Sequence, residues 1–129
     1  DELSRTRKSV WSAPSQAHKG DLVLFYFTHP DKSFNYIFRL TERATKIVAG
    51  WKPGKDYMAS IQRVCELNAP IFLEDLQNHR VLRTAGFVRG HIQGRPNVTE
   101  YWPYLYELIA RRNFSLKRIL AAYAPESLA

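Results

Sequence analysis

Two tryptophans stand in basic, turn-forming segments of the chain, Trp11 within Lys8–Pro14 and Trp51 within Gly50–Lys55. An indole ring offers a large apolar area with a negative face. A tryptophan in such a segment therefore either anchors a loop on the core or presents its face to a flat or cationic ligand. Each segment taken alone favours anchoring, and the charge of the rest of the chain favours binding.

Positive charge is in excess, with 19 Lys and Arg against 12 Asp and Glu and a net charge of +7. The stretch 80–95 holds four arginines and no acid, 111–118 holds four basic residues and no acid, and 32–55 holds six against Glu42 alone. Clustered basic residues are typical of proteins that bind a polyanion. We therefore expect nucleic acid as a partner; the alternative is a solvated surface with a positive bias. The expected contacts to its backbone are Arg7, Lys8, Lys52, Lys55, Arg89, Arg95 and Asn97.

Residues for metal or covalent chemistry are sparse. Cys65 is the only cysteine, and the four histidines (18, 29, 79 and 91) lack metal-ligand spacing, so no metal or cofactor is expected. Cys65 lies in an alternating apolar pattern and is interpreted as a small core residue. The nearest approach to a catalytic pair is His29 with Asp31, but His-Pro-Asp is typical of a turn. We expect a non-catalytic protein; the alternative is a small enzyme acting on nucleic acid.

The first half of the chain predicts strands. Leu22–Thr28 is apolar on both faces, which favours a strand buried on both sides rather than an edge strand. Residues 34–40 alternate as a half-buried strand, 46–49 form a short strand, and 57–67 form a long one.

The second half predicts mainly helices. The expected elements are a helical turn at 71–76, a short strand at 81–83, a glycine-punctuated loop at 86–97, a helix capped by Thr99 that runs through Arg112 and ends at Asn113, and a second helix capped by Ser115. This order predicts one α+β domain over residues 1–129, a small twisted mixed β-barrel flanked by helices.

The longest apolar run, Leu22–Phe27, is far too short to span a bilayer, and no charged-then-apolar leader opens the sequence. We expect a soluble, intracellular (cytoplasmic) protein with no membrane partner. Because the sequence begins at Asp1 rather than at methionine, we expect a module cut from a longer chain that carries a further domain.

The segment Trp11–Pro14 after a basic arm, the strand Leu22–Phe27 and the turn Trp51–Lys55 resemble the YTH domains, which read N6-methyladenine in RNA. The opening Lys19-Gly20-Asp21 followed by Leu-Val-Leu-Phe-Tyr is similar to the related EVE domains, prokaryotic members of the same PUA-like superfamily. The resemblance covers about residues 8–95. It departs from the family in one respect, because the family has a strand well upstream of the first tryptophan and only ten residues precede Trp11 here.

The resemblance implies a twisted barrel flanked by helices that holds a flipped-out modified base in an aromatic cage. Trp11 would take the place of the first cage tryptophan and Trp51 that of the second, with the backbone at Ser12 beside the base edge. The implied partner is DNA or RNA carrying a modified, for example methylated, base. The implied role is the targeting domain of a larger restriction or RNA-processing protein, with a protein-binding PUA-like domain as a further alternative.

Overall fold

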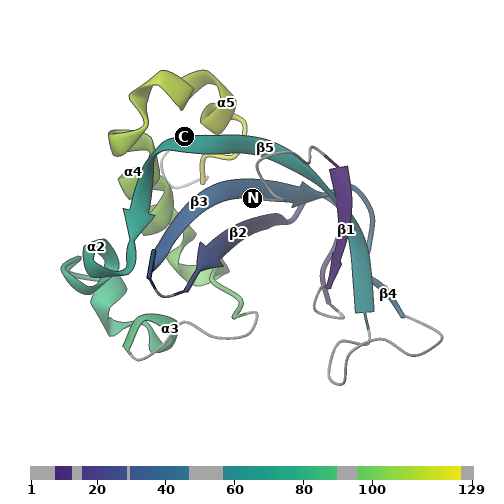
Figure 1. Cartoon of the computed structure of the whole chain (residues 1–129), viewed down its shortest axis with the longest axis horizontal. Coiled ribbons are helices and arrows are strands. Elements are labelled where there is room, and N and C mark those ends of the chain that lie inside the picture. The colour runs from purple at the N-terminus through teal and green to yellow at the C-terminus, as the bar shows by residue number, and fades with distance from the viewer. Residues whose placement is uncertain (1–7, 13–15, 29, 47–56, 90–95, 126–129) are drawn as a thin grey trace. The chain divides into compact units, whose positions relative to one another are not determined.

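The computed structural model describes residues 8–12, 16–28, 30–46, 57–89 and 96–125 (Figure 1). The chain forms two compact units, one from residues 1–25 and 36–66 and the other from 26–35 and 67–129. The strands are β1 (Lys8–Ser12), β2 (Leu22–Phe27), β3 (Ser33–Leu40), β4 (Thr45–Lys46) and β5 (Tyr57–Phe72). The helices are α2 (Leu73–Gln77), α3 (Gly86–Arg89), α4 (Trp102–Arg112) and α5 (Lys117–Ala121), with 3₁₀ turns η1 (Leu82–Thr84), η2 (Thr99–Tyr101) and η3 (Phe114–Leu116). The predicted α+β class is confirmed.

The strands follow the order β1-β5-β3-β2, and β4 pairs with β5. Both β1 and β4 are antiparallel to β5. The pairings among the described strands make an open path and close no barrel. β2 stands at one end of this path and is half-buried along its whole length, so the prediction of a strand buried on both sides is wrong. An apolar run does not by itself require full burial of the strand. Phe25 of β2 packs edge-on against Phe38, with 5.1 Å between the ring centroids, although β2 is only half-buried.

In the first unit, alternation along β5 builds part of the core, as predicted. The prediction that β3 is half-buried is wrong, because Ile37, on the face opposite Tyr36 and Phe38, is also buried, at 1% exposed. The buried apolar residues are Tyr36, Ile37, Phe38, Leu40, Ala44, Ala59, Ile61 and Cys65. The turn after β3 is tied to β5, because Thr41 N–H donates to the Ser60 carbonyl and Glu42 Oε1 accepts from the Ser60 N–H and hydroxyl. These bonds hold the start of β5 beside the chain that leads into β4.

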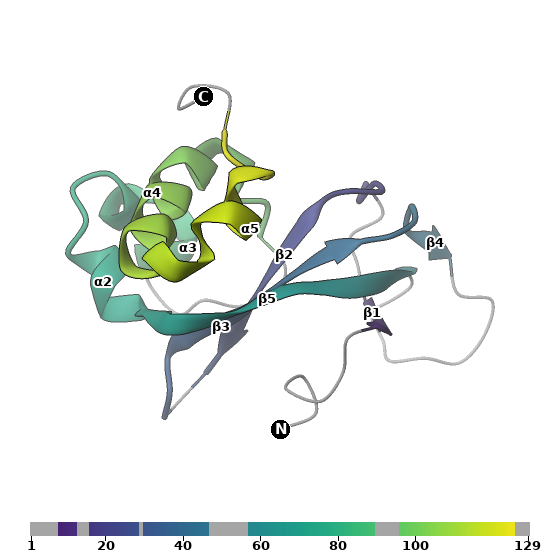
Figure 2. The same cartoon turned by 90° about the horizontal axis from the view of Figure 1, so that it is seen from above.

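In the second unit, α4 and α5 lie beside each other (Figure 2). α4 buries one face through Leu105, Leu108 and Ile109, and it ends at Asn113 as predicted. Thr99 does not cap this helix: its hydroxyl donates to Asn97 Oδ1, and η2 precedes the first residue of α4.

Three further predictions in this unit are wrong. Residues 81–83 form no strand, because His79 Nδ1 accepts the N–H groups of Val81 and Leu82 and so caps the 3₁₀ turn η1. Residues 86–89, expected in a loop, form α3 and bury Val88. The helical turn expected at 71–76 is shifted, because β5 continues through residue 72 and α2 begins at 73.

Ser115 is not the cap of α5 either. It lies inside η3, and its hydroxyl accepts a hydrogen bond from Asn68. No helix among residues 8–12, 16–28, 30–46, 57–89 and 96–125 is long and apolar enough to cross a membrane.

Candidate nucleic-acid interface

The two tryptophan-bearing segments are attached to the same end of β5. Met58 pairs with Ser12 of β1 and also with Thr45 of β4. The next β4 pair, Lys46 with Tyr57, closes the connection over residues 47–56 in which Trp51 stands. Figure 1 shows β1, in purple, alongside the first part of β5, with β4 nearby. Backbone pairing therefore gathers both segments at the start of one strand.

Within β1, each predicted contact residue occupies a defined register position. Lys8 lies opposite Gln62, Trp11 opposite Ala59, and Ser12 opposite Met58. Ala59 is fully buried. Five predicted site residues lie outside the described part of the chain: Arg7, Trp51, Lys52, Lys55 and Arg95.

Arg89 and Asn97 belong to the second unit, and both are exposed. Arg89 is the last residue of α3. Asn97 Oδ1 accepts from the Thr99 N–H at 3.0 Å and from its hydroxyl at 2.6 Å, so this oxygen turns the chain into η2. Asn97 thus has a local structural role that the sequence did not predict, and its contact to nucleic acid stays a prediction.

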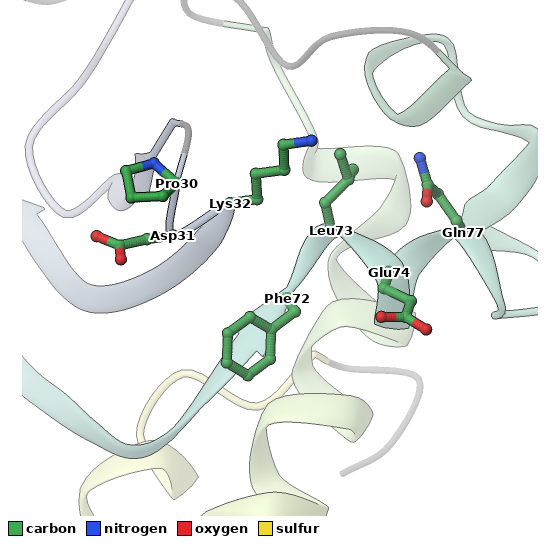
Figure 3. A pocket seen from close by; sticks show the side chains of 7 residues that line it. All are labelled: Pro30, Asp31, Lys32, Phe72, Leu73, Glu74 and Gln77. Carbon is green, nitrogen blue, oxygen red and sulfur yellow. The ribbon is translucent and has the colours of Figure 1, made fainter.

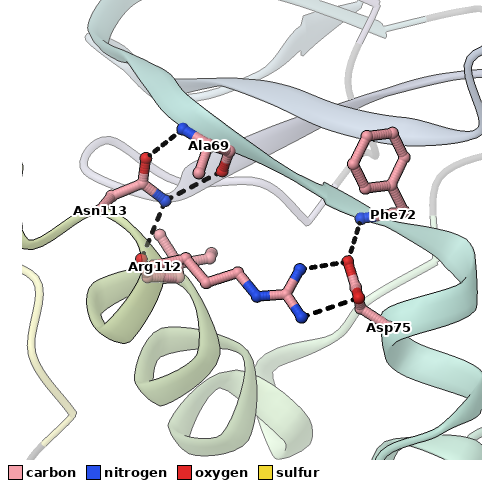
Figure 4. Close-up of polar contacts among 6 residues, drawn as sticks. Ala69, Phe72, Asp75, Arg112 and Asn113 are labelled. Carbon is pink, nitrogen blue, oxygen red and sulfur yellow. Dashed lines mark hydrogen bonds and ion pairs between the residues drawn. The ribbon is translucent and has the colours of Figure 1, made fainter.

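The four basic residues of 111–118 divide into two pairs. Arg111 forms an ion pair with Glu107 at 2.7 Å, and Arg112 holds Asp75 through two hydrogen bonds of 2.5 and 2.8 Å (Figure 4). Glu107, the partner of Arg111, lies one helical turn earlier, and Asp75, the partner of Arg112, lies on α2. Both acids are outside 111–118, so a count of charges within that segment does not include them. Lys117 and Arg118 are exposed on α5.

The Asp75 carboxyl responds to this arrangement. Burial raises its pKa, but the hydrogen bonds from Arg112 and from the Phe72 N–H, with the positive charge of Arg112, outweigh burial and bring the pKa below the ordinary 3.8. Asp75 is therefore held as an anion that joins α4 to the first turn of α2.

Phe114 is a candidate residue that the sequence did not single out. It is 74% exposed, and the Lys117 ammonium lies 5.5 Å from its ring centroid. The signal in the sequence was an aromatic residue inside a basic run, outside the apolar stripe of either neighbouring helix.

A shallow hollow of about 530 Å³ lies at the turn between β2 and β3 and the start of α2 (Figure 3). It is lined by Pro30, Asp31, Lys32, Phe72, Leu73, Glu74 and Gln77. Leu73 N–H donates to the Lys32 carbonyl at 2.8 Å, which joins its two walls. The hollow carries the acids Asp31 and Glu74 against the single base Lys32, a formal excess of one negative charge, so it does not favour a polyanion. His29, the proposed partner of Asp31, lies outside the described residues.

Groups that could support enzymatic chemistry are few in the described part of the chain. No three His, Cys, Asp or Glu side chains there lie close enough to hold a metal ion. Cys65 is buried, as predicted, and burial raises the pKa of its thiol, an effect that the charge of Arg63 opposes. A thiol in this setting is a poor nucleophile at neutral pH.

No family model matches the chain, and no curated protein matches its sequence. Among solved structures, it is similar to the NMR structure of Rpa0253 from Rhodopseudomonas palustris, with a TM-score of 0.62 and 16% sequence identity. The likeness covers 84% of this chain and 79% of that one. At this level of identity it concerns the fold alone.

Proposed function

We propose that this chain is a non-catalytic reader module that binds DNA or RNA carrying a modified base. Trp11 and Trp51 form an aromatic cage for the flipped-out base, and the backbone at Ser12 contacts its edge. The observation that carries the proposal is the double pairing of Met58, which attaches the Trp11 strand and the Trp51 connection to one end of β5.

Chain length supports this assignment. Trp51 follows Lys46 by five residues, so covalent geometry keeps it within about 18 Å of the Lys46 Cα at full extension. Lys46 pairs with Tyr57, and the next residue, Met58, pairs with Ser12. Both tryptophans are therefore tethered to the same short stretch of β5.

Charge supports the class of ligand. With a net charge of +7, the chain attracts a polyanion, and Arg89 presents its side chain to solvent at the end of α3. Phosphate contacts of this kind position a nucleic acid without reading its sequence. Selectivity then falls to the cage, where stacking contributes about 1 to 3 kcal/mol per base.

The fold that the resemblance to YTH and EVE domains implies is a PUA-like barrel. Its support is the α+β class, with strands β1 to β5 preceding the helices α2 to α5. Closure would have to bridge β1 and β2, the two ends of the described path, and NOEs between their backbone protons would reveal it. The role that we propose for such a module is to target a restriction or RNA-processing activity.

The test is a binding panel of labelled oligonucleotides, DNA and RNA, each with and without methylated or hydroxymethylated bases. We expect tighter binding to one modified form, unchanged by EDTA and without any conversion of the oligonucleotide. Equal affinity for modified and unmodified strands would contradict the reader function. Conversion of the oligonucleotide would favour the enzyme instead.

A further inference from the structure

Phe114 stands in η3, between α4 and α5, and is 74% exposed. Single apolar residues are common on protein surfaces, so exposure alone assigns no role. What distinguishes Phe114 is the way its backbone is held and the charge beside its ring.

The residues on both sides of Phe114 are bonded to β5. Asn113 is 1% exposed; its Oδ1 accepts from the Ala69 N–H at 2.7 Å, and its Nδ2 donates to the Ala69 carbonyl at 3.1 Å (Figure 4). Ser115 accepts from Asn68 at 2.5 Å. The exposed ring therefore projects from a fixed backbone, and a side chain presented in this way loses little freedom when it binds a ligand.

The charge beside the ring is positive. The Lys117 ammonium lies 5.5 Å from the ring centroid, and Arg118 follows it, exposed on α5. The acid Glu107 of α4 is paired with Arg111, one turn further along the helix. An aromatic ring with an ammonium over one face complements a ligand that combines planar rings with negative charge, which is the chemistry of an unpaired nucleotide.

We infer that Phe114 is a stacking platform for an unpaired base of single-stranded nucleic acid, with Lys117 and Arg118 contacting the adjacent phosphates. The inference rests on the proposed function, because it assigns a second contact to the same class of ligand. Unlike the cage, this platform does not depend on a modification, since every base has a face that can stack.

The experiment compares Phe114→Ala with wild type in anisotropy titrations of short, fluorescein-labelled single strands, each with and without one N6-methyladenine. Stacking of one base predicts a loss of affinity of about 5- to 150-fold, the same for modified and unmodified strands. Phe114→Trp keeps a ring and should retain wild-type affinity.

Ile119→Ala is the matched control, because Ile119 is also exposed on this part of the chain, at 45%, and has no ring to stack. It should bind as wild type does. An equal loss in both Ala variants would show that apolar surface in general, rather than ring stacking, contributes to the affinity, and would overturn the inference. Both variants should melt as wild type does. If Phe114→Ala unfolds, Phe114→Leu carries the test, since it keeps the apolar bulk without the ring.

The outcomes separate this inference from the function on which it rests. If wild type selects the modified strand and Phe114→Ala binds as tightly, only the stacking platform is wrong. If wild type binds every modified and unmodified strand of the panel equally and Phe114→Ala weakens them all, the reader function is wrong and the platform stands. If wild type binds no oligonucleotide, both are wrong.

Discussion

Asp75 and Arg112 form a bidentate ion pair, although they are 37 positions apart in the sequence. The carboxylate also accepts the Phe72 N–H at 2.8 Å, so one side chain joins the end of α4 to the start of α2. The pair is partly exposed, with 38% of the Arg112 side chain accessible, and solvent therefore screens part of its attraction.

We expect this pair to make stability depend on pH. The folded-state pKa of Asp75 lies below 3.8, so its contribution is full above that value and is lost as pH falls through the folded-state pKa. Asp75→Asn should lower the free energy of unfolding by about 1 kcal/mol at pH 7, and the difference should shrink below pH 3.8. Urea titrations across this range measure it. Glu74→Gln, the same change of charge at the exposed neighbour, should show no such pH dependence; if it does, the ion pair is not the cause.

Substitution of the two tryptophans separates a cage from a core. As cage residues, Trp11→Ala and Trp51→Ala should keep the fold and remove most discrimination between modified and unmodified strands. As core residues, each should cost about 3 to 5 kcal/mol of stability, and binding should fall with the fold. Thermal melts beside oligonucleotide titrations decide between them.

Trp102→Phe is the control for these tryptophans, because the Trp102 Nε1–H donates to the Tyr123 carbonyl at 2.9 Å. This variant should lose about 0.5 to 1.5 kcal/mol of stability without any change in selectivity. Two folded cage variants with wild-type selectivity would end the cage hypothesis.

Binding should weaken steeply with salt, because it releases counterions from phosphates. Replacing both Arg89 and Arg95 by Ala should reduce the slope of log K against log salt by about 0.7 to 0.9 per lost phosphate contact. Affinity for modified and unmodified strands should fall together. Arg111→Ala, at a residue already paired with Glu107, should change the slope less. Affinity that is indifferent to salt would refute the polyanion partner.

Cys65 should be unreactive in the folded protein, because the residue is only 7% exposed and burial raises the pKa of its thiol. A thiol-specific reagent such as Ellman's reagent should react fully in urea and hardly at all in buffer at neutral pH. Since this is the only cysteine in the chain, the signal has a single source. Rapid and complete labelling of the native protein would show that the thiol is accessible.

Sequence patterns predicted β3 and the first part of β5 as strands, because alternation and apolar runs are local signals. They did not predict β1, whose pairing with β5 is a contact between distant segments. The same reasoning failed at 81–83, where three residues are too few to show a period and the His79 ring decides the conformation. At 82–88 a signal was present and missed: Leu82, Ala85 and Val88 are all buried at helical spacing.

The candidate site was less predictable because it depends on pairing between distant segments. The tryptophan motifs are visible in the sequence, but which strand they pair with, and in what register, is set by tertiary packing. The partners of Arg111 and Arg112 illustrate the same limit, since one acid lies a turn away and the other on a different helix. Local charge counts therefore overstate the free positive charge of 111–118.

The buried amide of Asn113 has a consequence for dynamics. Its Nδ2 hydrogens are held by the carbonyls of Ala69 and Ile109, so they can exchange with solvent only when the end of α4 separates from β5. In an NMR spectrum this side chain should give a protected NH₂ pair, whose exchange rate reports the free energy of opening at this junction alone. Hydrogen exchange at the Asn113 side chain therefore measures the local stability of the turn that carries Phe114.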